Sequence, residues 1–297
     1  MKNVKNVLLV MFSVMVGGAS FAQSNLLNAK VPSEIGLKTP AQMISDNDKP
    51  LAYGYVHDRD ILMGKTVWEI IDLSERINFP LYFPIDENIG SDRRSLYTVL
   101  TTAVKEGKIT EVYSDSYFNT KKSFRDIESS LSRIDTTDAG REEINAGRRS
   151  VSPEYILRSD LTAQDVTQYK IKGFWYFDKR QSELKYRLLG ICPVTPDVYT
   201  MNSDEKDYIE LFWIFFPSAR EVLHDAKAFN DKNSSMPISF DQILNSRRFN
   251  SVIYKEENVY GDREIKDYMK DNSQNQLLEA ERVKEKIRNF ESDMWNY

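Results

Sequence analysis

The sequence contains little of the chemistry from which enzyme sites are usually built. Among its 297 residues there are two histidines, His57 and His224, and one cysteine, Cys192. Two histidines exclude a metal site made of several of them, and one cysteine cannot form an intramolecular disulfide. The Gly-x-Ser-x-Gly, His-Glu-x-x-His and Cys-x-x-Cys patterns are also missing. Cys192 lies in the apolar stretch 188–193, so we expect it to be buried and unreactive.

Long apolar runs are missing beyond the first residues. The chain opens with Lys2 and Lys5, is apolar over 7–16 and reaches small residues ending at Ala22, which predicts a signal peptide over 1–22 that leaves Gln23 first. No later window approaches the roughly 20 apolar residues of a spanning helix. Since no cysteine lies near the predicted cleavage point, a lipid anchor is not expected. The expectation is a protein outside the cytoplasm that reaches a membrane only through partners.

Excess positive charge is also missing. The net charge is −5, and removal of the leader with its two lysines makes the balance more acidic. This argues against nucleic acid or an anionic membrane surface as the main ligand. Gly64-Lys65-Thr66 superficially resembles a phosphate-binding loop, but Arg59 stands where that loop needs its first glycine. We expect no cofactor and no bound metal.

The pattern along the chain predicts an α+β fold of two lobes, with mixed helices and short, largely antiparallel strands. A Pro-containing arm without apolar periodicity occupies residues 23–50. The remaining boundaries are an N-terminal α/β lobe at 51–120, a polar helical connection at 121–165, a strand-rich lobe at 166–260 and a charged amphipathic helix at 261–297.

Within the first lobe, apolar residues at helical spacing predict a helix over 64–78 that ends before Pro80. A strand is expected at 81–83, a second helix at 96–104 that Gly107 stops, and a strand at 109–113.

In the second lobe, aromatic and β-branched segments predict strands at 169–177 and 184–194 joined as a hairpin. The most apolar run, 209–216, predicts a central strand. A helix beginning at Pro217 is expected next, then a short helix at 240–244 and a strand at 251–254. The layout of 239–254 resembles that of 95–113, which leaves open whether the two are related modules or a chance likeness.

The C-terminal helix carries an apolar seam. Val283, Ile287 and Phe290 recur at three and four residues, and Trp295 follows. The seam could dock on its own domain or in a groove of a partner. On the second alternative, Val283, Ile287, Phe290 and Trp295, together with the arm, are the candidate partner-binding residues.

Two features of the sequence are compatible with an enzymatic or a binding function. His57-Asp58-Arg59-Asp60 places two carboxylates beside a histidine, which is compatible with a metal-dependent periplasmic enzyme, although such a cluster is more often a solvated turn or salt link. Alternatively, an exposed aromatic platform around Trp175 and Tyr176 would suit a cargo- or carbohydrate-binding module.

Several stretches in the same order resemble the gliding-motility protein N family, also called GldN or PorN. They are 57–73, 78–84, 173–178, 190–193 and 215–220. The resemblance implies a non-enzymatic structural subunit of the type IX secretion and gliding machinery. It also implies a location in the periplasm beneath the outer membrane, and a ring formed by copies of the chain with a lipoprotein of the gliding-motility protein K type. The periplasmic part of the inner-membrane motor component, of the gliding-motility protein M type, is the further partner implied. The family offers no catalytic residues to carry over.

Overall fold

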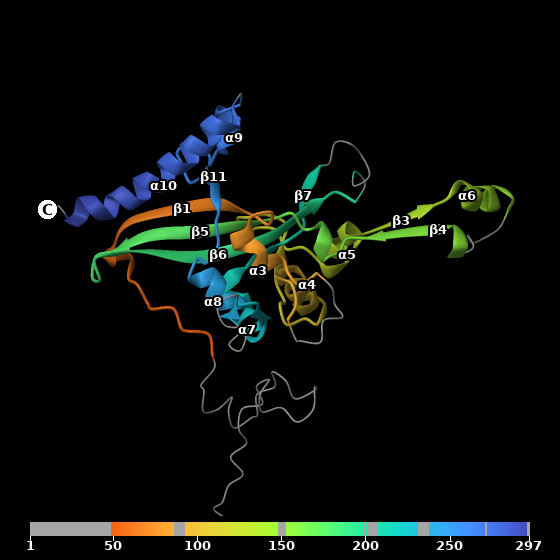
Figure 1. Cartoon of the computed structure of the whole chain (residues 1–297), viewed down its shortest axis with the longest axis horizontal. Helices are drawn as coiled ribbons and strands as arrows, with labels where there is room; N and C mark the ends of the chain where they lie inside the picture. The colour runs from red at the N-terminus through yellow and green to blue at the C-terminus, as the bar shows by residue number, and fades with distance from the viewer. Residues whose placement is uncertain are drawn as a thin grey trace, which may run out of the picture. The chain divides into compact units, whose positions relative to one another are not determined.

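A long antiparallel hairpin and one strand beside it organise the fold (Figure 1). In the computed structural model, the described residues are 49–85, 93–147, 153–198, 200, 207–230, 238–270 and 272–295. The predicted signal peptide at 1–22 and all but the end of the arm at 23–50 lie outside them. The described residues from Pro50 to Trp295 belong to one compact unit.

The main sheet is antiparallel and has the strand order β11-β1-β5-β6-β8-β2, with β7 pairing with β6. Its strands are β1 (Ile61–Asp72), β2 (Val112–Tyr113), β5 (Gln168–Asp178), β6 (Glu183–Pro196), β7 (Tyr208–Glu210), β8 (Trp213–Phe215) and β11 (Val252–Glu256). Two small ribbons pair β3 (Ser132–Thr136) with β4 (Ile156–Asp160) and β9 (Lys227–Ala228) with β10 (Ile238–Ser239).

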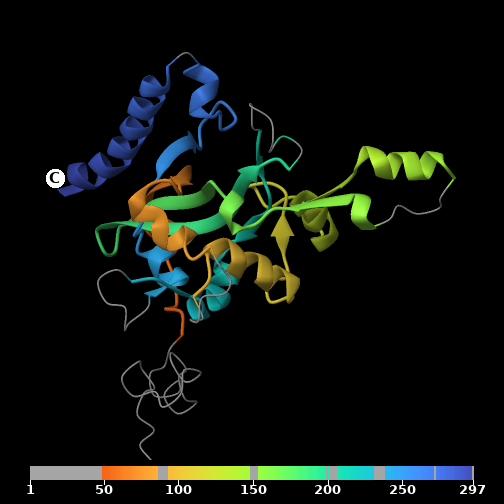
Figure 2. The same ribbon diagram turned by 45° about the vertical axis from the view of Figure 1, so that its right-hand side comes forward.

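The helices are α3 (Phe79–Tyr82), α4 (Leu96–Lys105), α5 (Phe124–Leu131), α6 (Asp138–Asn145), α7 (Phe216–Asp225), α8 (Phe240–Asn245), α9 (Ile265–Tyr268) and α10 (Ser273–Trp295). Figures 1 and 2 show the β3–β4 ribbon carrying α6 at its far end, and α10 lying alongside β11. No helix in the described part of the chain combines the length and apolar character that crossing a bilayer requires.

The α+β class, the antiparallel pairing and the C-terminal helix are confirmed. The two expected lobes differ from the structure, because strands from both regions form one sheet. β1, from the first region, pairs with β5 on one side and with β11 on the other. Hydrogen bonding between strands distant in sequence therefore joins the regions, and the stretch expected to connect them contains α5, the β3–β4 ribbon and α6.

The helix expected over 64–78 is wrong, since most of that stretch lies in the 12-residue strand β1. Successive strand residues point to opposite faces, and Val67 and Trp68 are both buried. A strand buried on both faces carries apolar residues at consecutive positions. Some of these residues are also three or four positions apart, which is the spacing of an amphipathic helix. The strand expected at 81–83 is also wrong, because Pro80 lies in the first turn of α3, where its missing N–H costs nothing.

The other expectations agree more closely with the structure. The hairpin is confirmed as β5 and β6, and α4, α7 and α8 begin at or within one residue of the expected places. The run 209–216 is interrupted: β7 and β8 flank Leu211 and Phe212, both buried.

The two similar helix-strand segments share their local geometry. Ser95 caps α4 by accepting from the Thr98 amide, and Ser239 caps α8 by accepting from the Gln242 amide. Two residues past each helix the backbone has a positive φ, 70° at Gly107 and 49° at Arg247. The strands that follow, β2 and β11, form opposite edges of the sheet. Serine caps and a positive φ after the last turn are common at helix ends, so this layout does not distinguish related modules from a chance likeness.

The main core lies between the sheet and helices α4, α7 and α8. Its largest fully buried members include Leu96, Leu100, Ile171, Ile191, Phe212, Phe216, Leu223 and Phe240. A second cluster joins β1 and β11 to α9 and α10, and a third surrounds Trp68, Cys192 and Trp213.

Candidate functional site

Helix α10 docks through its apolar seam onto the chain's own sheet. Val283 and Ile287 are 4% and 7% exposed and pack in one cluster with Val67 of β1 and Ile253 of β11. Near the end of α10, Phe290 meets Phe177 edge to face with ring centroids 5.6 Å apart. The intramolecular alternative therefore accounts for most of the seam.

Trp295 differs from the other three predicted partner-binding residues, because 68% of it is exposed. Met294 beside it is 39% exposed. Partner binding by the four residues stays a prediction, and Trp295 is the member whose surface is available for it. Val283 and Ile287 are already occupied by contacts within the chain.

The His57–Asp60 cluster forms a turn rather than a converging site. Asp58–Asp60 is a single 3-10 turn. The rings of His57 and Tyr55 are nearly perpendicular, with centroids 4.7 Å apart. The Asp60 carboxylate lies 3.9 Å from both Arg59 and Arg180 in ion pairs. The described residues contain no group of three or more His, Cys, Asp or Glu side chains placed to hold a metal. The geometry here is that of a salt-linked turn before β1.

Cys192 is fully buried, as expected. Its thiol donates to the Pro193 carbonyl at 3.4 Å, and burial raises the pKa of the Cys192 thiol well above its usual value. A thiol kept protonated is a poor nucleophile.

Trp175 and Tyr176 do not form an exposed platform. Tyr176 is 6% exposed. Trp175 is half-buried against Tyr186, with ring centroids 4.9 Å apart, and the guanidinium of Arg247 lies 5.2 Å from its ring. These aromatic side chains are used in packing, which removes the geometric basis of the carbohydrate-binding alternative at this position.

The chain segment before β1 is held to helices α7 and α8 by Tyr53. The guanidinium of Arg220 lies 4.1 Å from the centre of the Tyr53 ring, and the Tyr53 hydroxyl donates to Asn245 at 2.8 Å. Arg220 itself donates to both carboxylate oxygens of Asp241, at 2.8 and 3.1 Å. Arg187 also lies 4.6 Å from the centre of the Tyr53 ring and donates to the Gly54 carbonyl. The segment that follows the predicted arm is therefore anchored, whereas these contacts do not involve the arm itself, 23–50.

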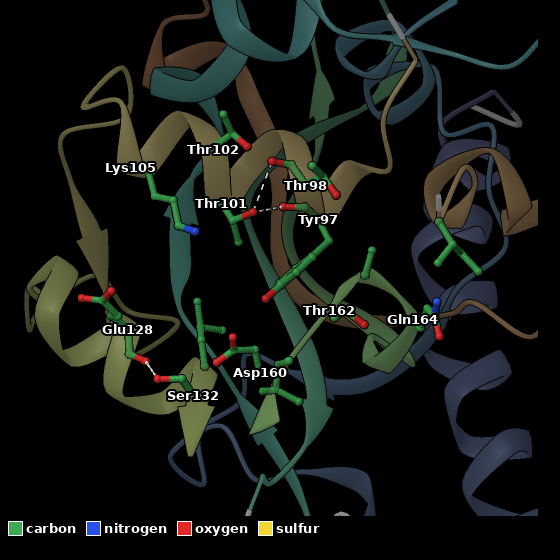
Figure 3. Close-up of a pocket in the computed structure, with 14 residues that line it drawn as sticks. Tyr97, Thr98, Thr101, Thr102, Lys105, Glu128, Ser132, Asp160, Thr162 and Gln164 are labelled. Carbon is green, nitrogen blue, oxygen red and sulfur yellow. Dashed lines mark hydrogen bonds between the residues drawn. The ribbon is translucent and has the colours of Figure 1, made fainter. Parts of the chain in front are cut away.

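A polar pocket of about 380 Å³ lies between α4, α5 and the base of the β3–β4 ribbon. Figure 3 shows hydroxyl-bearing residues of α4, with Tyr97, Thr98 and Thr101, facing Glu128, Ser132 and Asp160 across it. Burial, assisted by the nearby Asp165 charge, raises the pKa of the Tyr97 phenol, so the phenol stays neutral. The pocket is lined by hydrogen-bonding groups and by the titratable side chains of Lys105, Glu128 and Asp160.

An apolar groove runs along α3, and we call it the α3 groove. Its lining is Arg76, Ile77, Phe79, Pro80, Phe83, Pro84, Ile85, Arg93, Gln164 and Phe229, around a volume of about 1260 Å³. Four of its large apolar side chains are exposed by 38% to 56%. Exposed apolar patches of this kind mark sites that bind proteins, membranes or ligands. The sequence reasoning missed the groove because residues 78–84 were interpreted as a helix end and a strand.

Comparison with known proteins agrees with the family resemblance. No curated protein matches the chain. A family model described as gliding motility associated protein GldN matches residues 56–296, which is most of the chain. The match includes the sheet, the α3 groove and all but the last residue of the region containing α10. The chain therefore belongs to the GldN family of gliding motility associated proteins.

Proposed function

We propose that this protein is a periplasmic structural subunit of the type IX secretion and gliding machinery. It assembles with an outer-membrane lipoprotein of the gliding-motility protein K type into a ring, and contacts the periplasmic part of the inner-membrane motor component, of the gliding-motility protein M type. Membership of the GldN family supports the gliding role. The single structural observation that carries the assembly role is the exposed apolar surface of the α3 groove, because such surfaces are characteristic of protein interfaces.

The test is purification of the tagged, full-length protein from its native membranes in mild detergent, followed by mass spectrometry and size measurement. Recovery of a very large particle that contains a lipoprotein is the expected result. Recovery of a monomer without companions would overturn the proposal.

A matched pair of variants separates the structural role from the enzymatic alternative. Asp58→Ala/Asp60→Ala removes the carboxylates of the turn before β1, while Arg76→Glu reverses an exposed charge of the α3 groove. On the structural proposal, the first variant keeps secretion and gliding if it folds, and the second weakens assembly. Loss of secretion in the aspartate variant with an intact particle would favour the enzyme.

A further inference from the structure

The described lining of the α3 groove combines two arginines with apolar side chains. Arg76 and Arg93 line it, and no acidic side chain is among its described lining residues. The guanidinium of Arg93 lies 5.1 Å from the centre of the Phe229 ring, so cationic and aromatic surfaces are continuous there. The protein as a whole carries an excess of acidic residues. A groove of this composition suits a segment with an aromatic side chain and carboxylates beside it.

The last turn of α10 has that complementary composition. Met294 and Trp295 are exposed there, Asp293 is exposed beside them, and Glu291 precedes them. The turn contains no basic residue. A helix C-terminus carries partial negative charge and is stabilised by cations. Asp293 adds negative charge where the helix already has it, so an arginine from outside the helix would relieve the repulsion.

We infer that the α3 groove of one copy binds the end of α10, centred on Trp295, of a second copy. The indole enters between the exposed phenylalanines, and Arg76 faces the carboxylate of Asp293. Burying an aromatic side chain beside a guanidinium combines apolar and cation-π attraction. The end of α10 and α3 lie apart in both views of the chain (Figures 1 and 2), which makes a neighbouring copy the partner.

This contact joins two different surfaces, so a pair of copies keeps one free groove and one free helix end. Such a head-to-tail contact cannot close as a two-fold dimer, and repetition of it generates a ring or a filament. The inference rests on the proposed function, for which it supplies the contact between copies. It also leaves other surfaces of the protein free for the lipoprotein.

The experiment measures self-association of the full chain without its predicted leader by analytical ultracentrifugation over a range of concentrations. Trp295→Ala removes the indole. Arg76→Glu/Ile77→Glu reverses the charge at one exposed position of the groove and replaces an exposed apolar side chain at the next. Leu278→Ala and Arg59→Glu are the matched controls, because Leu278 is 69% exposed on α10 and the Arg59 side chain is 81% exposed outside the groove. Circular dichroism and thermal unfolding verify that each variant folds.

The expected result is that the unmodified chain and both controls associate, whereas each interface variant weakens association at least tenfold. Mixing the two interface variants restores one contact, since the groove of Trp295→Ala is intact and the helix end of the groove variant is intact. The mixture should therefore form one-to-one pairs that do not grow further. Arg76→Glu combined with Asp293→Arg should recover part of the association.

Two results would overturn the inference. A chain that stays monomeric at every concentration, or variants that associate as well as the unmodified chain, would exclude this contact between copies. If the groove variant instead loses the lipoprotein in the membrane purification while self-association is unchanged, the occupant of the groove is that partner. In that case the proposed function stands and the inference fails.

Discussion

The guanidinium of Arg247 donates to both carboxylate oxygens of Glu69, at 3.0 and 2.7 Å, and so joins the turn after α8 to strand β1. The Ser251 hydroxyl donates to the same carboxylate. Glu69 is 1% exposed. Arg247 also lies 4.1 Å from the centre of the Tyr186 ring. This pair connects residues 178 positions apart.

Removal of Arg247 alone should be costly because it leaves the Glu69 carboxylate buried without its cation. We expect Arg247→Met to lower the free energy of unfolding by about 3–5 kcal/mol. Methionine, like arginine, is a non-glycine residue at the positive φ of this position, so backbone strain changes little. The double variant Glu69→Leu/Arg247→Met should lose less free energy of unfolding than the single variant, because it leaves no buried carboxylate without a cation. Urea unfolding measures both, and a double variant less stable than Arg247→Met would contradict this account.

Gly173 is required by the close approach of Tyr186. A Cβ atom at position 173 would lie 2.1–2.2 Å from atoms of the Tyr186 side chain, in a strand packed on both sides. Gly173→Ala should therefore destabilise the fold by about 1–3 kcal/mol. Gly54→Ala is the control, since nothing lies within 4 Å of its added methyl group. Equal thermal midpoints for the two variants would show that Tyr186 moves aside without cost.

Tyr53 should control the protection of the segment before β1. Tyr53→Ala removes the ring that Arg187 and Arg220 contact and the hydroxyl that donates to Asn245. We expect faster proteolytic cleavage within residues 50–57, with the unfolding of the sheet nearly unchanged. Tyr53→Phe keeps the ring and should cost only about 1 kcal/mol for the lost hydrogen bond. Tyr55→Ala, at a residue 80% exposed, is the control, and comparable cleavage in all variants would exclude the anchor.

Cys192 should react with thiol reagents only when the core opens. The side chain is fully buried, and burial raises the pKa of its thiol. In the native protein, labelling by an aromatic disulfide reagent is expected to follow the rate of unfolding, and urea should accelerate it. An added thiol in a Cys192-free background, Ser74→Cys at an exposed position, should react at once. Rapid native labelling of Cys192 would refute its burial.

Glu279 should make the stability of helix α10 sensitive to acid. Arg282 donates to both Glu279 oxygens, at 2.8 and 2.6 Å, and these hydrogen bonds lower the pKa of the Glu279 carboxyl. The folded-state pKa is therefore below the unfolded one. The stabilisation is present above the ordinary glutamate pKa of about 4.3 and is lost as the pH falls through the folded value.

Glu279→Gln should accordingly be less stable than the unmodified chain at pH 7, and the difference should shrink as the pH falls below 4. Denaturant unfolding at several pH values measures the difference. Glu281→Gln, at a side chain 65% exposed, controls for loss of charge. A Glu279→Gln effect that is constant from pH 7 to pH 3 would rule out the linkage.

Local sequence signals were sufficient for many elements of the fold. Apolar spacing predicted where α4 and α8 begin, and the structure adds that serine at 95 and 239 caps each helix, because its side-chain oxygen accepts from a free amide of the first turn. The β5–β6 hairpin followed from two β-rich segments with a short polar connection. The burial of Cys192 followed from its apolar neighbours, and the family followed from several short stretches in the same order along the chain.

Contacts between residues far apart in sequence decided the rest. Apolar spacing in 61–72 fits a helix or a strand buried on both faces, and pairing with β5 and β11 selected the strand. The seam of α10 was evident, but its docking on β1 and β11 depended on an apolar surface that exists only once those strands pair. For the same reason the α3 groove appeared only in three dimensions, since its lining comes from segments as distant as Arg76 and Phe229. Short-range chemistry thus determines caps, turns and hairpins, whereas surfaces suited to binding arise from long-range packing.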